Sequence, residues 1–156
     1  MIIKSFEIDK TNFDNKYFFL LYGQNEGHKK EIIKQKFKKF KSESIYLYEE
    51  NEVLQNKSNF FNNILSKSFF EKDKLVIISR VSDKIKNIVE EIIEKEVCDL
   101  TLILNAGILE KKSKLRSLFE KDKKIFCIPF YEDNNQTLSG IINKFFRDNK
   151  TPISQQ

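Results

Sequence analysis

Residues 16–33 have the sequence KYFFLLYGQNEGHKKEII, which joins an apolar run to a stretch of helical period through a turn at Gly23. The apolar residues are consecutive, as expected for a strand that is covered on both faces of a parallel sheet. After the turn, apolar residues recur at Ile33, Phe37 and Phe40, which is the spacing of one helix face. This stretch therefore predicts the strand–turn–helix unit of an α/β fold.

The same alternation of short β-rich runs and longer helical stretches continues along the chain. Further strands are predicted by the runs IIKSFEI (2–8), SIYLYE (44–49), KLVIISRV (74–81), DLTLILNA (99–106) and KIFCIPF (124–130). Helices are predicted over NEVLQNKSNFFNNILSKS (51–68), SDKIKNIVEEIIEKE (82–96), which opens with a cap at Ser82 or Asp83, and EKKSKLRSLFEKDK (110–123). Strands that alternate with helices predict a parallel sheet flanked by helices.

The last part of the chain departs from this alternation. A loop at 131–135 is followed by TLSGIINKFFRDNK (137–150), an amphipathic helix that has no strand after it. Such a helix is poorly explained as part of the sheet. We therefore expect one domain over residues 1–133 and the first helix of a further helical domain over residues 134–156.

Composition indicates a cytoplasmic globular domain. The chain has 156 residues, and its net charge of +5 comes mostly from lysines that alternate with acidic residues. Arginine, which recognises phosphates and bases best, occurs only three times, so a dedicated base-reading surface is not expected, although a basic DNA-binding module stays an alternative. No apolar run is long enough to cross a bilayer, and the first ten residues lack a secretory signal. The two cysteines, Cys98 and Cys127, lie far apart and are expected to be inert thiols in a reducing compartment.

The turn after the first main strand resembles a phosphate-binding loop in which the motif is broken. A functional loop has the pattern GxxxxGK[ST], but Gly23 and Gly27 are one residue too close together. Lys29 follows His28 instead of a glycine, no hydroxyl residue follows it, and Glu26 adds a negative charge where phosphates would bind. The sequence therefore predicts a degenerate, non-functional phosphate loop. A nucleotide-binding or kinase-like fragment is the alternative interpretation.

Catalytic and metal-binding groups are not predicted. The runs 74–81 and 99–106 carry no acidic residue at their carboxyl ends, where an ATPase would need one to hold magnesium. Asp83, just beyond the first of these runs, is better interpreted as a helix cap. His28 is the only histidine, so a site built from several histidines cannot form. We expect no catalytic residue, no metal and no cofactor.

A pair of aromatic residues marks the segment SKSFFEKDK, residues 66–74. Phe69 and Phe70 are adjacent and follow a predicted helix directly, so they cannot easily face the same core. One of them at least is expected to be exposed, and exposed aromatic pairs on a connector commonly anchor a protein partner. The alternative is that Phe69 caps the core while Phe70 covers the neighbouring helix.

Four stretches in order resemble the N-terminal domain of the delta subunit of bacterial DNA polymerase III. They are FLLYGQNEGHKKEII (19–33), ILSKSFFEKDKLVIISRVSDKI (64–85), LEKKSKLRSLFEKDK (109–123) and IPFYEDNNQTLSGIINKFF (128–146). The pattern S-[LF]-F-x-x-x-x-L-[VI] in front of the third main strand is among the more specific of these features. The agreement extends along almost the whole chain, from about Tyr17 to Ser154.

The resemblance implies an AAA+-like domain of P-loop NTPase type that has lost ATP binding, followed by the start of a helical lid domain. It implies a non-hydrolysing clamp-loader subunit of a DNA-directed DNA polymerase, a nucleotidyltransferase complex. Its partners would be the sliding clamp (beta subunit), the gamma/tau and delta prime subunits, and DNA through the complex. The clamp-binding residues carried over from the family are Leu65, Ser68, Phe69 and Phe70. Nearby Lys67, Lys72 and Lys74 would steer the domain toward an acidic clamp surface.

Overall fold

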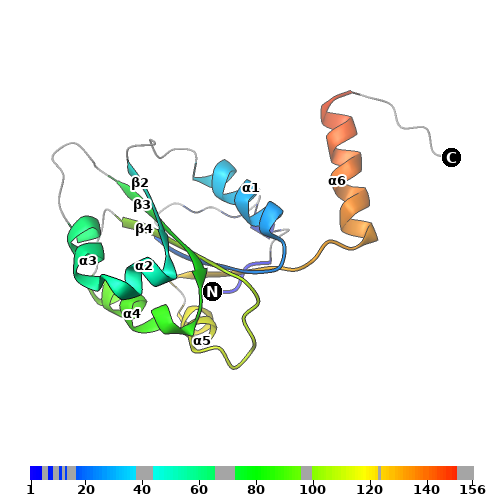
Figure 1. Cartoon of the computed structure of the whole chain (residues 1–156). Helices are drawn as coiled ribbons and strands as arrows, with labels where there is room; N and C mark the ends of the chain where they lie inside the picture. The colour runs from blue at the N-terminus through cyan, green and yellow to red at the C-terminus, as the bar shows by residue number, and fades with distance from the viewer. Residues whose placement is uncertain are drawn as a thin grey trace.

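The computed structural model describes residues 1–4, 7–8, 11, 13, 17–37, 44–65, 73–95, 100–122 and 124–150. Its centre is a five-stranded parallel sheet in the order β2-β3-β4-β1-β5 (Figure 1). The strands are β1 (Phe18–Gly23), β2 (Ile45–Glu49), β3 (Lys74–Val81), β4 (Leu100–Ala106) and β5 (Phe126–Phe130). Because β1 lies between β4 and β5, the turn that follows it is enclosed by the ends of both neighbours.

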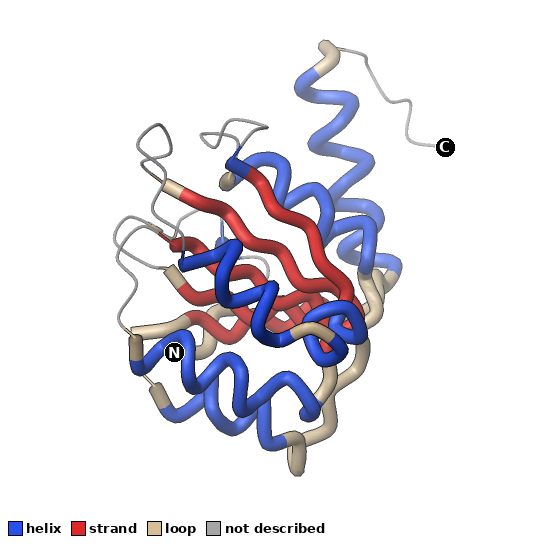
Figure 2. Tube along the Cα trace, turned by 60° about the vertical axis from the view of Figure 1, so that its left-hand side comes forward, coloured by secondary structure: helices blue, strands red, loops and turns tan. Residues whose placement is uncertain are grey.

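Helices cover both faces of this sheet (Figures 1 and 2). Helix α1 (Glu26–Lys36) lies on one face. The other face carries α2 (Glu50–Gln55), α3 (Lys57–Leu65), the short 3₁₀ helix η3 (Asp83–Ile85), α4 (Lys86–Glu94) and α5 (Lys114–Lys121). The predicted layered α/β fold is confirmed.

The strands bury alternate side chains in two separate cores, because successive residues of a strand point to opposite faces. In β1, Leu20 and Tyr22 pack into the larger core under α2–α5, while Phe19 and Leu21 pack into the smaller core under α1. A strand that serves two cores needs apolar residues at every position, which explains the unbroken FFLLY run. Leu115 and Phe119 of α5 are also fully buried, as their helical spacing predicted.

Two predicted elements differ from the observed ones. The run 2–8 does not form a named strand in its described part: Ile2 makes a single bridge to Cys127, through hydrogen bonds of the Ile3 N–H and the Met1 carbonyl, and Ile8 is buried in the smaller core. The helix predicted over 51–68 is divided into α2 and α3 at Asn56, whose φ of −135° ends the first helix. The Asn56 side chain then accepts a hydrogen bond from the Asn59 backbone N–H, so this residue starts the second helix as well.

Helix α6 (Asn135–Asp148) projects away from the sheet (Figure 1). Asn134 caps it, accepting hydrogen bonds from the backbone of Gln136 and Thr137. Its apolar side chains follow helical spacing but remain exposed: they are Leu138, Ile141, Ile142 and Phe145. The helix therefore has an apolar face that the described part of the chain does not cover.

Candidate functional site

The turn at the carboxyl end of β1 is tightly enclosed by backbone. Gly23 has a φ of +122°, and a Cβ atom placed there would lie 2.0 Å from the carbonyl oxygen of Phe130. The Gly23 N–H donates to the carbonyl oxygen of Gly107 at 2.8 Å, and the Asn25 N–H donates to that of Phe130 at 3.4 Å. Only glycine fits both the left-handed backbone and the close approach.

Lys29 points inward from the first turns of α1 and is fully buried. Its Nζ atom donates to the carbonyl oxygens of Gly23 at 2.9 Å and Ala106 at 2.7 Å, and it lies 2.5 Å from Oε1 of Glu26. A lysine ammonium has three N–H donors, and all three are used by these protein oxygens. Lys29 therefore stabilises the turn through hydrogen bonds inside the fold.

Glu26 completes this cluster at the start of α1. Its second carboxylate oxygen accepts a 3.3 Å hydrogen bond from the Asn105 side chain at the end of β4. Desolvation opposes ionisation of this carboxyl group, but the hydrogen bonds from Lys29 and Asn105 prevail and lower the pKa of Glu26 below its usual value. A negative charge thus lies at the start of α1, where it would repel an approaching phosphate.

Gly27 and His28 follow Glu26 in the same turn. Gly27 lies in the first turn of α1, and a Cβ atom there would meet only Oδ1 of Asn25, at 3.8 Å. His28 is half-buried and packs edge-to-face against the ring of Phe130, with 5.1 Å between the ring centroids. Of the two glycines in the broken motif, only Gly23 is sterically required.

The carboxyl ends of β3 and β4 hold no carboxylate that would bind magnesium. The register between these strands is interrupted between Ser79 and Val81, and the intervening Arg80 has a φ of +58°. The Arg80 guanidinium extends toward solvent and pairs with Glu49 at 3.1 Å. Oδ1 of Asn105 is buried and has no hydrogen-bond partner among the described residues.

Asp83 links two helices on the larger-core side of the sheet. Ser82 caps η3, as predicted, by accepting from the Lys84 backbone N–H. The Asp83 carboxylate accepts from the Ser113 hydroxyl at 2.5 Å and from the backbone N–H groups of Lys114 and Leu115. Asp83 is therefore a cap, but of α5 and not of the helix it begins. Its partner could have been sought in the sequence, because Ser113 is itself a typical N-cap residue.

The predicted clamp-binding segment connects α3 with β3. Leu65 is the last residue of α3; it is half-buried and packs against the larger core. Ser68, Phe69 and Phe70 lie outside the described residues, so their assignment stays a prediction.

The lysine at the end of this segment is not a surface charge. Lys74 is only 5% exposed, and its Nζ donates to the carbonyl oxygen of Asn63 at 3.1 Å. The ammonium also lies 5.7 Å from the centre of the Tyr46 ring, a cation–π distance. The expectation that Lys74 steers the domain toward a partner is therefore wrong: this lysine packs the start of β3 against α3.

Other reactive groups contribute no site in the part of the chain that the structure describes. Cys127 is fully buried in β5, and burial raises the pKa of its thiol to about 12, which disfavours the reactive thiolate. Cys98 lies outside the described residues. Within the described ranges, no group of three or more His, Cys, Asp and Glu side chains is placed to hold a metal ion. In the same ranges, no helix has both the length and the apolar character that a membrane span needs.

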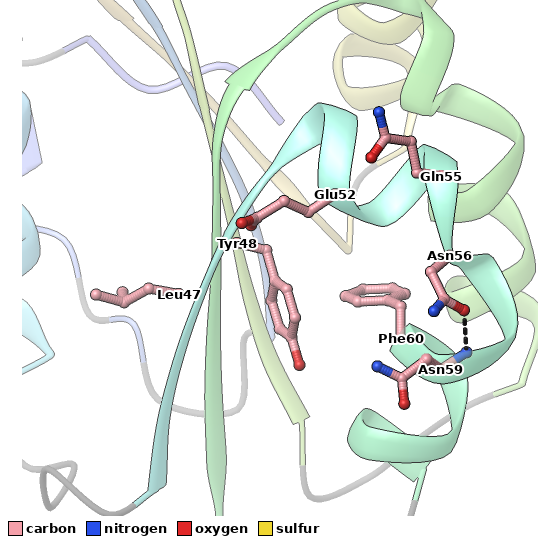
Figure 3. A pocket seen from close by; sticks show the side chains of 7 residues that line it. All are labelled: Leu47, Tyr48, Glu52, Gln55, Asn56, Asn59 and Phe60. Atoms are coloured by element: carbon pink, nitrogen blue, oxygen red, sulfur yellow. Dashed lines mark hydrogen bonds between the residues drawn. The ribbon is translucent and has the colours of Figure 1, made fainter.

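A hollow of about 380 Å³ lies beside the edge strand β2 (Figure 3). The rings of Tyr48 and Phe60 meet edge-to-face at 5.1 Å along one side of it. The residues that line it are Leu47, Tyr48, Glu52, Gln55, Asn56, Asn59 and Phe60. Its one carboxylate, on Glu52, accepts from the backbone N–H of Glu49 and caps α2. The hollow therefore holds neither a nucleophile nor a general base that is free for chemistry.

The fold defines a class of structure: an α/β domain in which helices flank a five-stranded parallel sheet. Of solved structures, the chain is similar to the DNA clamp loader delta protein (YqeN) of Bacillus subtilis, with a TM-score of 0.63 and 15% sequence identity. The match covers 95% of this chain and 47% of that one, so the chain spans about half the length of its structural neighbour. No protein-family model and no curated protein sequence matches the chain.

Proposed function

We propose that this chain is the clamp-binding domain of a clamp-loader delta subunit, which grips a sliding clamp and helps to open it without hydrolysing ATP. The observation that carries the proposal is the buried Lys29 in an AAA+-like fold. Its ammonium is bonded to the carbonyl oxygens of Gly23 and Ala106, so it cannot reach a nucleotide without breaking those bonds. In this proposal the domain does not use ATP, and its role is to bind a partner.

The partner-binding element in this proposal is the connector between α3 and β3. Phe69 and Phe70 would enter an apolar pocket of the clamp, and Leu65 and Ser68 would shape the connector. Buried aromatic anchors of this kind contribute about 2–4 kcal/mol each to binding. Opening the ring needs no hydrolysis by this domain, because tighter binding to the open clamp than to the closed clamp shifts the population toward the open form.

Helix α6 has a place in the same proposal. We assign residues 1–133 to the AAA+-like domain and α6 to the first helix of a lid domain, whose other helices would cover Leu138, Ile141, Ile142 and Phe145. The exposed apolar face of α6 supports this assignment. In the complete loader, the gamma/tau and delta prime subunits would supply ATP hydrolysis, and DNA would be contacted by the complex as a whole.

The proposal is tested by measuring binding to the purified sliding clamp. The double variant Phe69→Ala, Phe70→Ala should lose at least about 100-fold in affinity, since two anchors are removed. The matched control is Ile141→Ala, Ile142→Ala, which removes two exposed apolar side chains from α6 and should bind normally. Full affinity in the Phe69/Phe70 variant would refute the site. Stabilisation of the wild-type chain by magnesium–ATP would favour the nucleotide-binding alternative, and tight, steeply salt-dependent binding to DNA would favour the basic DNA-binding module.

A further inference from the structure

A row of apolar side chains crosses the sheet on the α1 face and ends uncovered at the free edge of β2. Cross-strand pairing aligns Phe126, Phe19, Ile103, Ile77 and Leu47, one from each strand. The first three are at most 2% exposed, Ile77 is half-buried, and Leu47 is 70% exposed. Helix α1 packs over the first part of this row, as the shared core with Ile32 shows, and leaves its last member open.

The backbone at Leu47 is also available for pairing. The Glu49 N–H donates to the Glu52 side chain and not to β3. Alternate residues of a strand direct their backbone groups to the same side, so the N–H and C=O groups of Leu47 point to the same open edge. In the described part of the chain, β2 is the edge of the sheet and pairs only with β3. Short length, charged side chains, proline and bulges protect edge strands; β2 is short and ends in Glu49, but it has no lysine, proline or bulge.

We propose that the β2 edge binds a second copy of this chain, with the two β2 strands antiparallel across a twofold axis at Leu47. Leu47 is the third of the five residues in β2, so a twofold axis at this position pairs Tyr46 with Tyr48 and Ile45 with Glu49 across the two copies. Its N–H and C=O groups would pair with those of Leu47 in the second copy through two reciprocal hydrogen bonds. The two leucine side chains would cover each other, and the apolar row would continue through both sheets.

The opposite face of the edge fits the same arrangement. Antiparallel pairing about Leu47 places Tyr46 of the second copy opposite Tyr48, on the face that carries α3. The hollow beside Tyr48 and Phe60 lies on this face, and its open side would be closed by the incoming strand (Figure 3). The amide groups of Gln55 and Asn59 line the hollow and could donate hydrogen bonds to that strand.

The interface would be small, because β2 is short and its last N–H is already used by the cap of α2. Small interfaces belong to the weak, transient class. Sedimentation should therefore be measured from about 10 µM to 1 mM, a range that brackets affinities of that class. The average mass should rise from 18.6 kDa toward twice that value across this range.

The deciding variant is Leu47→Lys, which places two like charges opposite each other on the twofold axis. It should remain monomeric at every concentration, and its fold should be unchanged because Leu47 is exposed. Ile108→Lys is the matched control: Ile108 is 68% exposed but follows β4, so its variant should associate as the wild type does. The proposal would be overturned if the wild-type chain stays monomeric at 1 mM, or if Leu47→Lys associates as the wild type does. If Ile141→Lys alone abolishes association, the contact between copies belongs to α6 instead.

Cross-linking tests the register directly. Directly opposed residues of a hydrogen-bonded antiparallel pair have Cα atoms about 5.5 Å apart, which a disulfide can span. In a Cys98→Ser background, Leu47→Cys should form a covalent dimer under mild oxidation, while Ile108→Cys should not. Equal yields from the two variants would contradict the twofold arrangement. Leu47→Lys should leave clamp binding intact. Clamp binding and self-association are measured in separate experiments, so the two proposals can fail independently.

Discussion

The ammonium group of Lys29 donates a hydrogen bond to the carbonyl oxygen of Ala106, 2.7 Å away and 77 residues later in the chain. This contact joins the first helix to the end of the strand beside β1. The lysine therefore holds the sheet and α1 together.

The first prediction follows from this contact. Lys29→Met keeps the length of the apolar stem but leaves two carbonyl oxygens and the Glu26 carboxylate without their donor. Hydrogen bonds to charged groups are worth about 1.5–3 kcal/mol, so the free energy of unfolding in urea should fall by about 2–3 kcal/mol. Lys30→Met, at the exposed neighbouring position, should change it by less than about 0.5 kcal/mol. If both variants are equally stable, Lys29 does not hold the turn together.

The second prediction separates the two glycines of the broken phosphate motif. Gly23→Ala should destabilise the chain by about 3 kcal/mol, since the new Cβ would clash with the Phe130 carbonyl oxygen and the φ of +122° disfavours any L-residue. Gly27→Ala should cost nothing and is expected to be slightly stabilising, because alanine favours a helix and meets no close atom there. Thermal unfolding of the two variants checks the difference. Equal losses would contradict the steric argument.

The sequence predicted the parts of this fold that depend on local pattern. The burial of β1 could be predicted from the unbroken apolar run FFLLY. The burial of one face of α5 could be predicted from the spacing of Leu115 and Phe119. The departure of the loop from the phosphate-binding pattern is visible in its glycine spacing, and its lack of function stays a prediction. The buried hydrogen bond of Lys29 could not be predicted, because its acceptor, Ala106, belongs to a strand that is distant in the sequence.

Two misjudged segments show the same limit. The run 2–8 has the composition of a strand, yet the described sheet holds it only through one bridge between Ile2 and Cys127. The division of the 51–68 helix at Asn56 had a weak local signal, since asparagine favours helix ends and caps. The aromatic pair Phe69–Phe70 remains a sequence prediction, which the clamp-binding experiment decides.

The third prediction concerns the pH dependence of stability through Asp83. Desolvation opposes its ionisation, but hydrogen bonds from Ser113, Leu115 and Lys114 lower the pKa of this carboxyl group in the folded state. A depressed carboxyl pKa contributes stability above the unfolded value of about 3.9, and the contribution is lost as the pH falls through the folded value. Asp83→Ala should therefore cost about 1 kcal/mol at pH 7, the usual value of a cap.

The cost of this substitution should shrink as the pH is lowered below about 4, where the wild-type carboxylate becomes protonated. Urea unfolding of the wild type and the variant at several pH values gives this difference directly. Glu94→Ala, at an exposed position on α4, is the control and should show a small difference at every pH. A cost for Asp83→Ala that does not change with pH would mean that packing, and not the charged cap, is what the substitution removes.

The fourth prediction concerns the backbone at Arg80. Its φ of +58° is the left-handed region, which costs an L-residue roughly 1–2 kcal/mol relative to glycine. The bulge at this residue turns the chain so that the Ser82 N–H reaches the buried carboxylate of Glu50 at 2.6 Å, which explains why the strain is retained.

The comparison of Arg80→Gly with Arg80→Ala isolates the strain, because both variants lose the exposed ion pair with Glu49. The glycine variant should be the more stable by about 1 kcal/mol in urea unfolding. At Glu31, an exposed position in the interior of α1, the order of the two substitutions should be reversed, since alanine is favoured over glycine there. The same order at both positions would show that the bulge does not strain Arg80.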